Sequence, residues 1–163
     1  RGSAAMKTCW IKIKFTVVLL LTMCTFFPSL LPTGAWAAGR VNWYDYREAK
    51  TLAKQDGKQV YLYFRSDRCT YCVQMEKETL NSPEVARFLN RNFVSARIDS
   101  DQNPGLAAEY RVVGLPTSYF LQSDGGKIGG LPGFQAPDRF LAFLRFLHSE
   151  SYRKMSFGEF LKE

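Results

Sequence analysis

A strand-to-helix junction is predicted at residues 64–76, which read FRSDRCTYCVQME. Just before it, residues 60–64 form a nearly continuous apolar and aromatic run, which is typical of a strand buried on both faces. The polar segment after the run carries two apolar side chains and is compatible with a helix. The pattern therefore places a Cys-x-x-Cys pair, Cys69 and Cys72, at the N-terminus of a helix.

A cysteine at a helix N-terminus is suited to nucleophilic chemistry. The unpaired N–H groups and partial positive charge of that end favour an anion, and the thiolate is the form of cysteine that attacks a disulfide. Cys72 follows Cys69 by about one turn on the same face, near enough to attack a mixed disulfide formed there. Arg65 and Arg68 could strengthen the thiolate, or they could be ordinary solvated surface. The spacing indicates a nucleophile with a resolving partner.

The same pair also fits half of a zinc site, or two small residues at the edge of a core. Zinc takes about four ligands, usually from two such pairs or from one pair with histidines. The chain has one histidine, His148, and its other cysteines are Cys9 and Cys24. Disulfide exchange is therefore the preferred interpretation, and no metal site is expected.

An export signal is predicted at residues 6–38. Three lysines precede an apolar run at residues 15–31, and a small-x-small site follows at residues 35–38. This arrangement predicts cleavage after Ala37 or Ala38. Cleavage would release the protein into the periplasm or the medium, whereas a retained signal would anchor it in the membrane.

The net charge of +7 is mostly a property of this N-terminal segment. Residues 39–163 hold 18 basic and 15 acidic side chains, a net charge of +3, with no run of lysine or arginine, so no nucleic-acid site is predicted. They keep two of the four cysteines, and a bond between residues three apart closes too short a loop to stabilise a fold by chain entropy. A reactive role for the pair is favoured over a structural one.

The hydrophobic pattern predicts an α/β domain at residues 39–148. Helices are expected at 43–56 with Asn42 as cap, at 69–79, from Pro83 with Ser82 as cap, at 106–110 and at 137–148, and strands at 60–64, 93–98, 118–122 and 127–131. The first two strands are expected to be parallel and the last two to form an antiparallel hairpin. Residues 1–5 are expected to be a cloning remnant or an upstream start. The tail 149–163 is expected to carry a short helix and to pack on the domain of a monomer.

The segment from residue 41 to residue 148 resembles the thioredoxin superfamily. The resemblance rests on CTYC at 69–72, on DQNPG at 101–105 and on GLPT at 114–117. Within that superfamily, the chain is similar to exported thioredoxin-like proteins of the sulfur-oxidation-associated and Dsb-related kinds. The resemblance implies the thioredoxin fold, a mixed central sheet flanked by helices, and a redox pair of cysteines that needs no metal or organic cofactor.

The resemblance also implies a substrate-binding surface. Pro116 would follow a cis peptide bond and lie against the cysteine pair, with Leu115 offering its backbone to an extended substrate and Thr117 beside them. Gly133 and Phe134 would form part of the same apolar groove, or else an ordinary turn. The implied partners are protein thiols and disulfides, and a redox partner protein at the inner membrane.

Three residues depart from the family pattern. Tyr63 stands in place of the buried acid that accepts the proton of the resolving cysteine, Arg97 replaces the lysine that partners this acid, and Arg68 replaces a tryptophan. Proton transfer from Cys72 would then use water, Glu76 or Tyr63, and a phenol with a pKa of about 10 is a poor base at neutral pH. Slower resolution is therefore expected. Arg68 should favour the nucleophilic thiolate and make the disulfide more oxidising.

These observations predict an exported thiol:disulfide oxidoreductase that exchanges disulfides with protein substrates through Cys69 and Cys72, with reduction as the favoured direction. Two alternatives stay open. One is a metallochaperone that holds Cu(I) or zinc with the same cysteines. The other is a non-catalytic thioredoxin-fold module that binds a partner.

Overall fold

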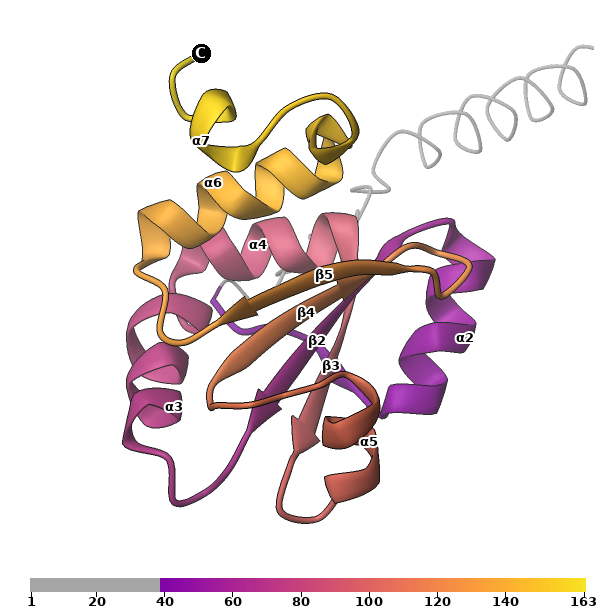
Figure 1. Ribbon diagram of the computed structural model, residues 1–163, viewed down its shortest axis with the longest axis vertical. Helices are drawn as coiled ribbons and strands as arrows, with labels where there is room; N and C mark the ends of the chain where they lie inside the picture. The colour runs from indigo at the N-terminus through magenta and orange to yellow at the C-terminus, as the bar shows by residue number, and fades with distance from the viewer. Residues whose placement is uncertain (1–38) are drawn as a thin grey trace, which may run out of the picture. The chain divides into compact units, whose positions relative to one another are not determined.

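The computed structural model describes residues 39–163, which form a mixed five-stranded sheet with helices on both faces (Figure 1). In chain order the elements are β1 (Trp43–Tyr44), α2 (Tyr46–Asp56), β2 (Gln59–Arg65), α3 (Thr70–Gln74), η2 (Met75–Leu80), α4 (Pro83–Asn92), β3 (Phe93–Asp99), α5 (Pro104–Glu109), β4 (Thr117–Leu121), β5 (Lys127–Pro132), α6 (Pro137–His148), η3 (Ser151–Arg153) and α7 (Phe157–Phe160). Residues 1–5 and the predicted signal peptide at 6–38 lie outside the described residues. Within residues 39–163, no helix combines the length and the apolar character needed to cross a membrane.

The strands lie in the order β1-β3-β2-β4-β5. β1 and β2 are both parallel to β3, and β4 is antiparallel to both β2 and β5. The parallel crossover from β2 to β3 and the β4–β5 hairpin confirm the predicted topology. β2 and β3 also end in register, with Arg65 opposite Asp99, so the loops that follow them leave the sheet side by side.

β2 lies at the centre of the sheet, and its side chains alternate between two cores. Tyr61 and Tyr63 enter a core that η2, α4 and α6 close on one face. Val60, Leu62 and Phe64 enter a second core that α2 and α5 close on the other face. Because both faces are covered, all five side chains are completely buried, which explains the continuous apolar run in the sequence.

The first helix begins later than predicted, and Asn42 is not its cap. Trp43–Tyr44 instead form β1, which pairs with β3. The prediction was wrong because Trp43 packs on two tyrosines of β2, with ring centroids 5.9 and 5.8 Å away, and a local pattern does not reveal such contacts. α2 starts after Asp45, whose side chain accepts the N–H of Arg47 at 2.9 Å. The other predicted elements agree with the observed ones to within two residues.

The helix after the cysteine pair changes type along its length. α3 runs directly into η2, a π-helix whose hydrogen bonds join residues five apart, so the single helix predicted over 69–79 is divided. Residues five apart share a face in a π-helix, and Met75 and Leu80 are accordingly both buried. Contacts outside the helix hold this turn: Thr79 donates to the carbonyl of Gln135, and the N–H of Gln135 donates to the Met75 sulfur at 3.4 Å.

The C-terminal tail packs on α6 (Figure 1). Ser156 and Glu159 form a capping box that starts α7. Phe157 and Phe160 then contact Phe146 of α6, with ring centroids 5.4 and 5.3 Å apart. These aromatic contacts attach the tail to the domain.

Candidate active site

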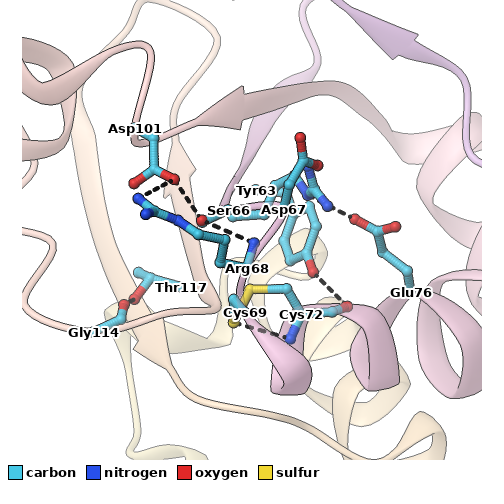
Figure 2. The surroundings of a disulfide bond; sticks show 11 residues. Tyr63, Ser66, Asp67, Arg68, Cys69, Cys72, Glu76, Asp101, Gly114 and Thr117 are labelled. Atoms are coloured by element: carbon cyan, nitrogen blue, oxygen red, sulfur yellow. Dashed lines mark hydrogen bonds and ion pairs between the residues drawn. A yellow bond between two sulfur atoms is a disulfide. The ribbon is translucent and has the colours of Figure 1, made fainter.

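The cysteine pair lies beyond the C-terminal end of β2, at the start of α3. Cys69 is the N-cap residue of α3 and forms a disulfide with Cys72, with the two Cα atoms 5.2 Å apart. The backbone N–H of Cys72 donates to the Cys69 sulfur at 3.1 Å (Figure 2). Cys69 is partly exposed, whereas Cys72 is 0% exposed. Of the two cysteines, Cys69 is therefore the one with surface open to a partner.

Tyr63 lies beneath the pair and holds the backbone of Cys72. Its hydroxyl donates to the Cys72 carbonyl at 3.1 Å (Figure 2). Burial, and then the nearby carboxylate of Glu76, raise the pKa of Tyr63 well above its ordinary value. The phenol therefore keeps its proton at neutral pH and serves as a hydrogen-bond donor.

Replacing Tyr63 with phenylalanine is expected to lower the free energy of unfolding by about 1 kcal/mol, because one buried hydrogen bond is lost. The pH dependence of mixed-disulfide resolution is expected to stay unchanged, because the phenol is not the base. Denaturant unfolding and stopped-flow exchange over a pH series would measure the two effects. Tyr61→Phe is the matched control, since Tyr61 is equally buried and shares its hydroxyl with Ser118 at 3.1 Å. A lost pH dependence in Tyr63→Phe alone would make the phenol the proton acceptor.

Glu76 and Arg97 both lie close enough to Tyr63 for their charges to affect its pKa. Glu76 Oε1 is 3.1 Å from Arg65 Nε, close enough for an ion pair but without the alignment of a hydrogen bond. The exposed Arg97 lies over the ring of Trp43, 6.0 Å from its centroid. Both Glu76 and Arg97 line an open hollow of about 410 Å³. Water that enters this hollow contacts the carboxylate of Glu76, which lies one helical turn after Cys72 in the chain.

Arg68 turns toward Asp101, on the loop after β3 (Figure 2). Its Nη2 lies 3.3 Å from Asp101 Oδ2, and its side chain is 86% exposed. Ser66 donates to the same carboxylate oxygen at 2.7 Å. Ser66 and Asp101 were not among the site residues predicted from the sequence. The DQNPG motif at 101–105 was the available signal, because parallel strands that end in register bring this motif beside the cysteine loop.

The 114–117 turn has the cis peptide bond that the resemblance implied, between Leu115 and Pro116. Pro116 is buried, its carbonyl accepts the N–H of Gly133 at 2.7 Å, and Thr117 donates to the carbonyl of Gly114 at 2.7 Å. Within residues 39–163, the Leu115 backbone makes no hydrogen bond. Its polar groups are free to pair with an extended chain.

Gly133 and Phe134 follow β5. Gly133 has φ 81°, a left-handed conformation that glycine adopts without strain, and its N–H is held by Pro116. Phe134 is partly buried and packs against the core on the Tyr61 face of the sheet. The hydrogen bond thus connects this turn directly to the 114–117 turn.

Exposed apolar side chains that were not predicted lie within and just after the cysteine motif and just before the 114–117 turn. Tyr71 and Val73 on α3 are 63% and 54% exposed, and Val113, just before the turn, is 96% exposed. The available signal was helical phase: Cys72 and Met75 mark the buried face of the helix, and Tyr71 and Val73 fall outside it. These side chains offer apolar contact area to a partner.

Metal-ligating side chains do not gather in the part of the chain that the structure describes. Residues 39–163 contain no group of three or more histidine, cysteine, aspartate or glutamate side chains placed to hold an ion. His148 lies on α6, packed against Phe88 and Phe93 with ring centroids 5.8 and 6.4 Å away.

Comparison with known proteins agrees with this geometry. Residues 46–148 match the family of thioredoxin-like domains. The disulfide bond reductase DsbH of Chlamydia pneumoniae is 30% identical over 119 residues, which are 66% of this chain and 71% of that protein. The solution structure of a thioredoxin from Thermus thermophilus has a TM-score of 0.61 and 39% identity, covering 66% of this chain and 86% of that one. The oxidised C-terminal domain of Neisseria meningitidis DsbD has a TM-score of 0.53 and 28% identity, covering 63% and 96%.

The family match spans both the cysteine pair and the 114–117 turn. The mixed sheet, the helix-capping disulfide and these likenesses lead to the same assignment. The chain belongs to the thioredoxin-like domain family, and it is a thiol:disulfide oxidoreductase of the thioredoxin superfamily.

Proposed function

We propose that this protein is an exported reductase of disulfides in other proteins, with Cys69 as nucleophile and Cys72 as resolving cysteine. The observation that carries the proposal is the difference in exposure: Cys69 is partly exposed at the start of α3, and Cys72 is completely buried behind it. The direction is supported by the likeness to DsbH, which is named a disulfide bond reductase.

The reaction transfers two electrons from the reduced pair to the substrate. The Cys69 thiolate attacks one sulfur of a substrate disulfide, that S–S bond breaks, and the other substrate sulfur leaves as a thiolate that takes a proton from water. Cys72 then loses its proton and attacks the Cys69 sulfur of the mixed disulfide. The second substrate thiol is released, and the Cys69–Cys72 disulfide remains.

The substrate is proposed to lie across the 114–117 turn. The Leu115 backbone, which has no hydrogen bond to any residue of 39–163, suits strand-like pairing with an extended chain. The Pro116 carbonyl is already occupied by Gly133, so this hydrogen bond holds the two turns together rather than binding substrate. Thr117 supports the turn from within, and Phe134 forms the apolar side of the groove. Unfolded proteins have the extended, apolar segments that such a surface accommodates.

The proton of Cys72 is proposed to leave through Glu76 or through water in the hollow that Glu76 lines. Glu76 lies one helical turn beyond Cys72, and one of its oxygens faces Arg65. Arg65 and Arg97 balance negative charge on this side of the pair. Tyr63 is not proposed as the acceptor, because its hydroxyl donates to the Cys72 carbonyl and its pKa is raised by burial.

Export is proposed from the signal pattern at residues 6–38, with cleavage near Ala37 or Ala38. In the periplasm a reductase needs a supply of electrons, so we assign a dithiol redox partner at the inner membrane. The protein is proposed to act as a monomer of one domain, 39–148, because its tail packs on α6 of the same chain.

The reduction potential of the Cys69–Cys72 pair is expected near that of thioredoxin, about −270 mV. The reason is that the neighbouring Arg68 is paired with Asp101, so its charge does little to stabilise the reduced thiolate. Equilibration in a series of dithiothreitol buffers, followed by alkylation of free thiols, would measure it.

A potential near about −120 mV, the value of a strong oxidant of exported chains, would reverse the proposed direction. A pair that does not oxidise at all would reject disulfide exchange and favour metal binding by the same cysteines. Metal retained after dialysis would then distinguish that role from binding of a protein partner.

A further inference from the structure

The Asp101 carboxylate joins the two loops that follow β2 and β3 (Figure 2). Its Oδ2 accepts the Ser66 hydroxyl at 2.7 Å and lies 3.3 Å from Arg68 Nη2. Ser66 is buried, and its oxygen also lies 3.3 Å from the backbone N–H of Arg68. The Asp101 carboxylate therefore contacts Arg68, the residue before Cys69, and also Ser66 in the loop that leads to Cys69.

The turn that carries Asp101 is itself held in place. The Asp99 carboxylate accepts the backbone N–H of Asp101 at 2.9 Å, and the Asn103 side chain donates to the Asp99 carbonyl at 2.9 Å. The hydrogen bond from Ser66, and then the hydrogen bond and charge of Arg68, hold the pKa of Asp101 below its ordinary value. Asp101 thus presents a fixed negative charge at neutral pH.

We propose that Asp101 is a positioning residue: it draws the Arg68 guanidinium away from Cys69 and offsets its charge, which keeps the Cys69–Cys72 pair reducing. This inference rests on the proposed exchange function of the pair.

The physical reason is that the Cys69 thiolate and the Asp101 carboxylate compete for one cation, the Arg68 guanidinium. A cation beside a thiolate stabilises the reduced form of a dithiol and makes its disulfide more oxidising. Arg68 directly precedes Cys69, and its long side chain is 86% exposed. Within residues 39–163, Asp101 is the carboxylate with which Arg68 is paired. While this pair persists, the thiolate gains little from the arginine.

Asp101→Asn tests the inference because it removes the charge and keeps an oxygen for Ser66. We expect the equilibrium with glutathione to shift two- to fivefold toward the reduced pair, since exposed charge interactions are worth up to about this factor. For two electrons this shift corresponds to about 9 to 21 mV. Cys69 should also react faster with iodoacetamide at neutral pH. An unchanged equilibrium constant would overturn the inference.

A double-mutant cycle with Arg68→Met shows whether the effect passes through Arg68. The Asp101→Asn shift is expected to shrink to less than half in the Arg68→Met background. An undiminished shift would mean that the Asp101 charge acts directly on the thiolate, which overturns the positioning role.

Ser66→Ala is the structural control, because it loosens the loop but keeps both charges. It is expected to leave the equilibrium constant within twofold of the parent, and a shift as large as that of Asp101→Asn would overturn the charge argument. Asp101→Ser replaces the asparagine variant if that protein does not fold. If the parent protein exchanges disulfides but its equilibrium constant is unchanged by these substitutions, this inference alone is wrong. If the Cys69–Cys72 pair of the parent never oxidises, the proposed function is wrong.

Discussion

Replacing Cys69 with serine is expected to abolish disulfide exchange, with a loss of more than about 1000-fold in rate. Serine cannot form the mixed disulfide, and Cys72 cannot replace Cys69 because it is completely buried. Reduction of insulin with dithiothreitol as electron donor would measure the loss. Residual activity within tenfold of the parent would show that Cys72 is reachable and that the proposed roles are wrong.

Cys72→Ser is the matched variant, because it removes the other sulfur and leaves the nucleophile exposed. It is expected to make a covalent adduct with substrate at Cys69 that persists, since resolution is lost. Non-reducing electrophoresis and mass spectrometry would detect the adduct. If Cys69→Ser formed adducts in equal yield, the proposed roles of Cys69 as nucleophile and Cys72 as resolving cysteine would be wrong.

Replacing Phe120 with alanine is expected to lower the free energy of unfolding by about 3–5 kcal/mol. Phe120 is 1% exposed on β4. Its ring stacks on Tyr61 at 5.3 Å and contacts Phe143 of α6 at 5.7 Å, so the substitution leaves a cavity between sheet and helix. Denaturant unfolding of the oxidised protein would measure the change.

Val113→Ala is the control for this effect, because Val113 is 96% exposed and has little packing to lose. Its free energy of unfolding is expected to stay within about 0.5 kcal/mol of the parent. A cost below 1 kcal/mol for Phe120→Ala would mean that the core between β4 and α6 is less closely packed than the structure shows.

The position of the site follows from the sheet. β2 and β3 are parallel and end in register, so the cysteine loop and the DQNPG loop leave the sheet at one edge although 35 residues separate Ser66 from Asp101. The β4–β5 hairpin places the 114–117 turn and Gly133 in contact, through one hydrogen bond. The cysteine pair thus lies at the start of α3, and the buried strands hold that helix start and the neighbouring loops in place.

Much of the fold could be predicted from local patterns. The run at 60–64 indicated a strand covered on both faces because each position in it is buried by one of two cores. Ser82 and Pro83 marked the start of α4 correctly, because proline is tolerated at the first position of a helix. These signals depend on neighbours in the chain, which is why they can be interpreted without the tertiary structure.

The errors arose where distant residues decide the local conformation. Trp43 entered a strand because it packs on side chains of β2, not because of its neighbours in the sequence. The π-helix at Met75–Leu80 hydrogen-bonds through two side chains to Gln135, far along the chain. Arg68 was predicted to favour the thiolate or to be solvated surface, and its ion-pair partner Asp101 could not be identified without the register of β2 and β3.

The sequence by itself determined the position of the cysteine pair, the order of the main strands and helices, and which cysteine comes first at the helix start. Spacing and periodicity are local properties of the chain, so they can be found in the sequence. The tertiary structure alone decided that Cys72 is buried, that the Tyr63 hydroxyl donates to the Cys72 carbonyl, and that Arg68 pairs with Asp101. Burial and charge pairing depend on which distant segments come into contact, and these contacts are determined by the packing of the two cores on either face of the sheet.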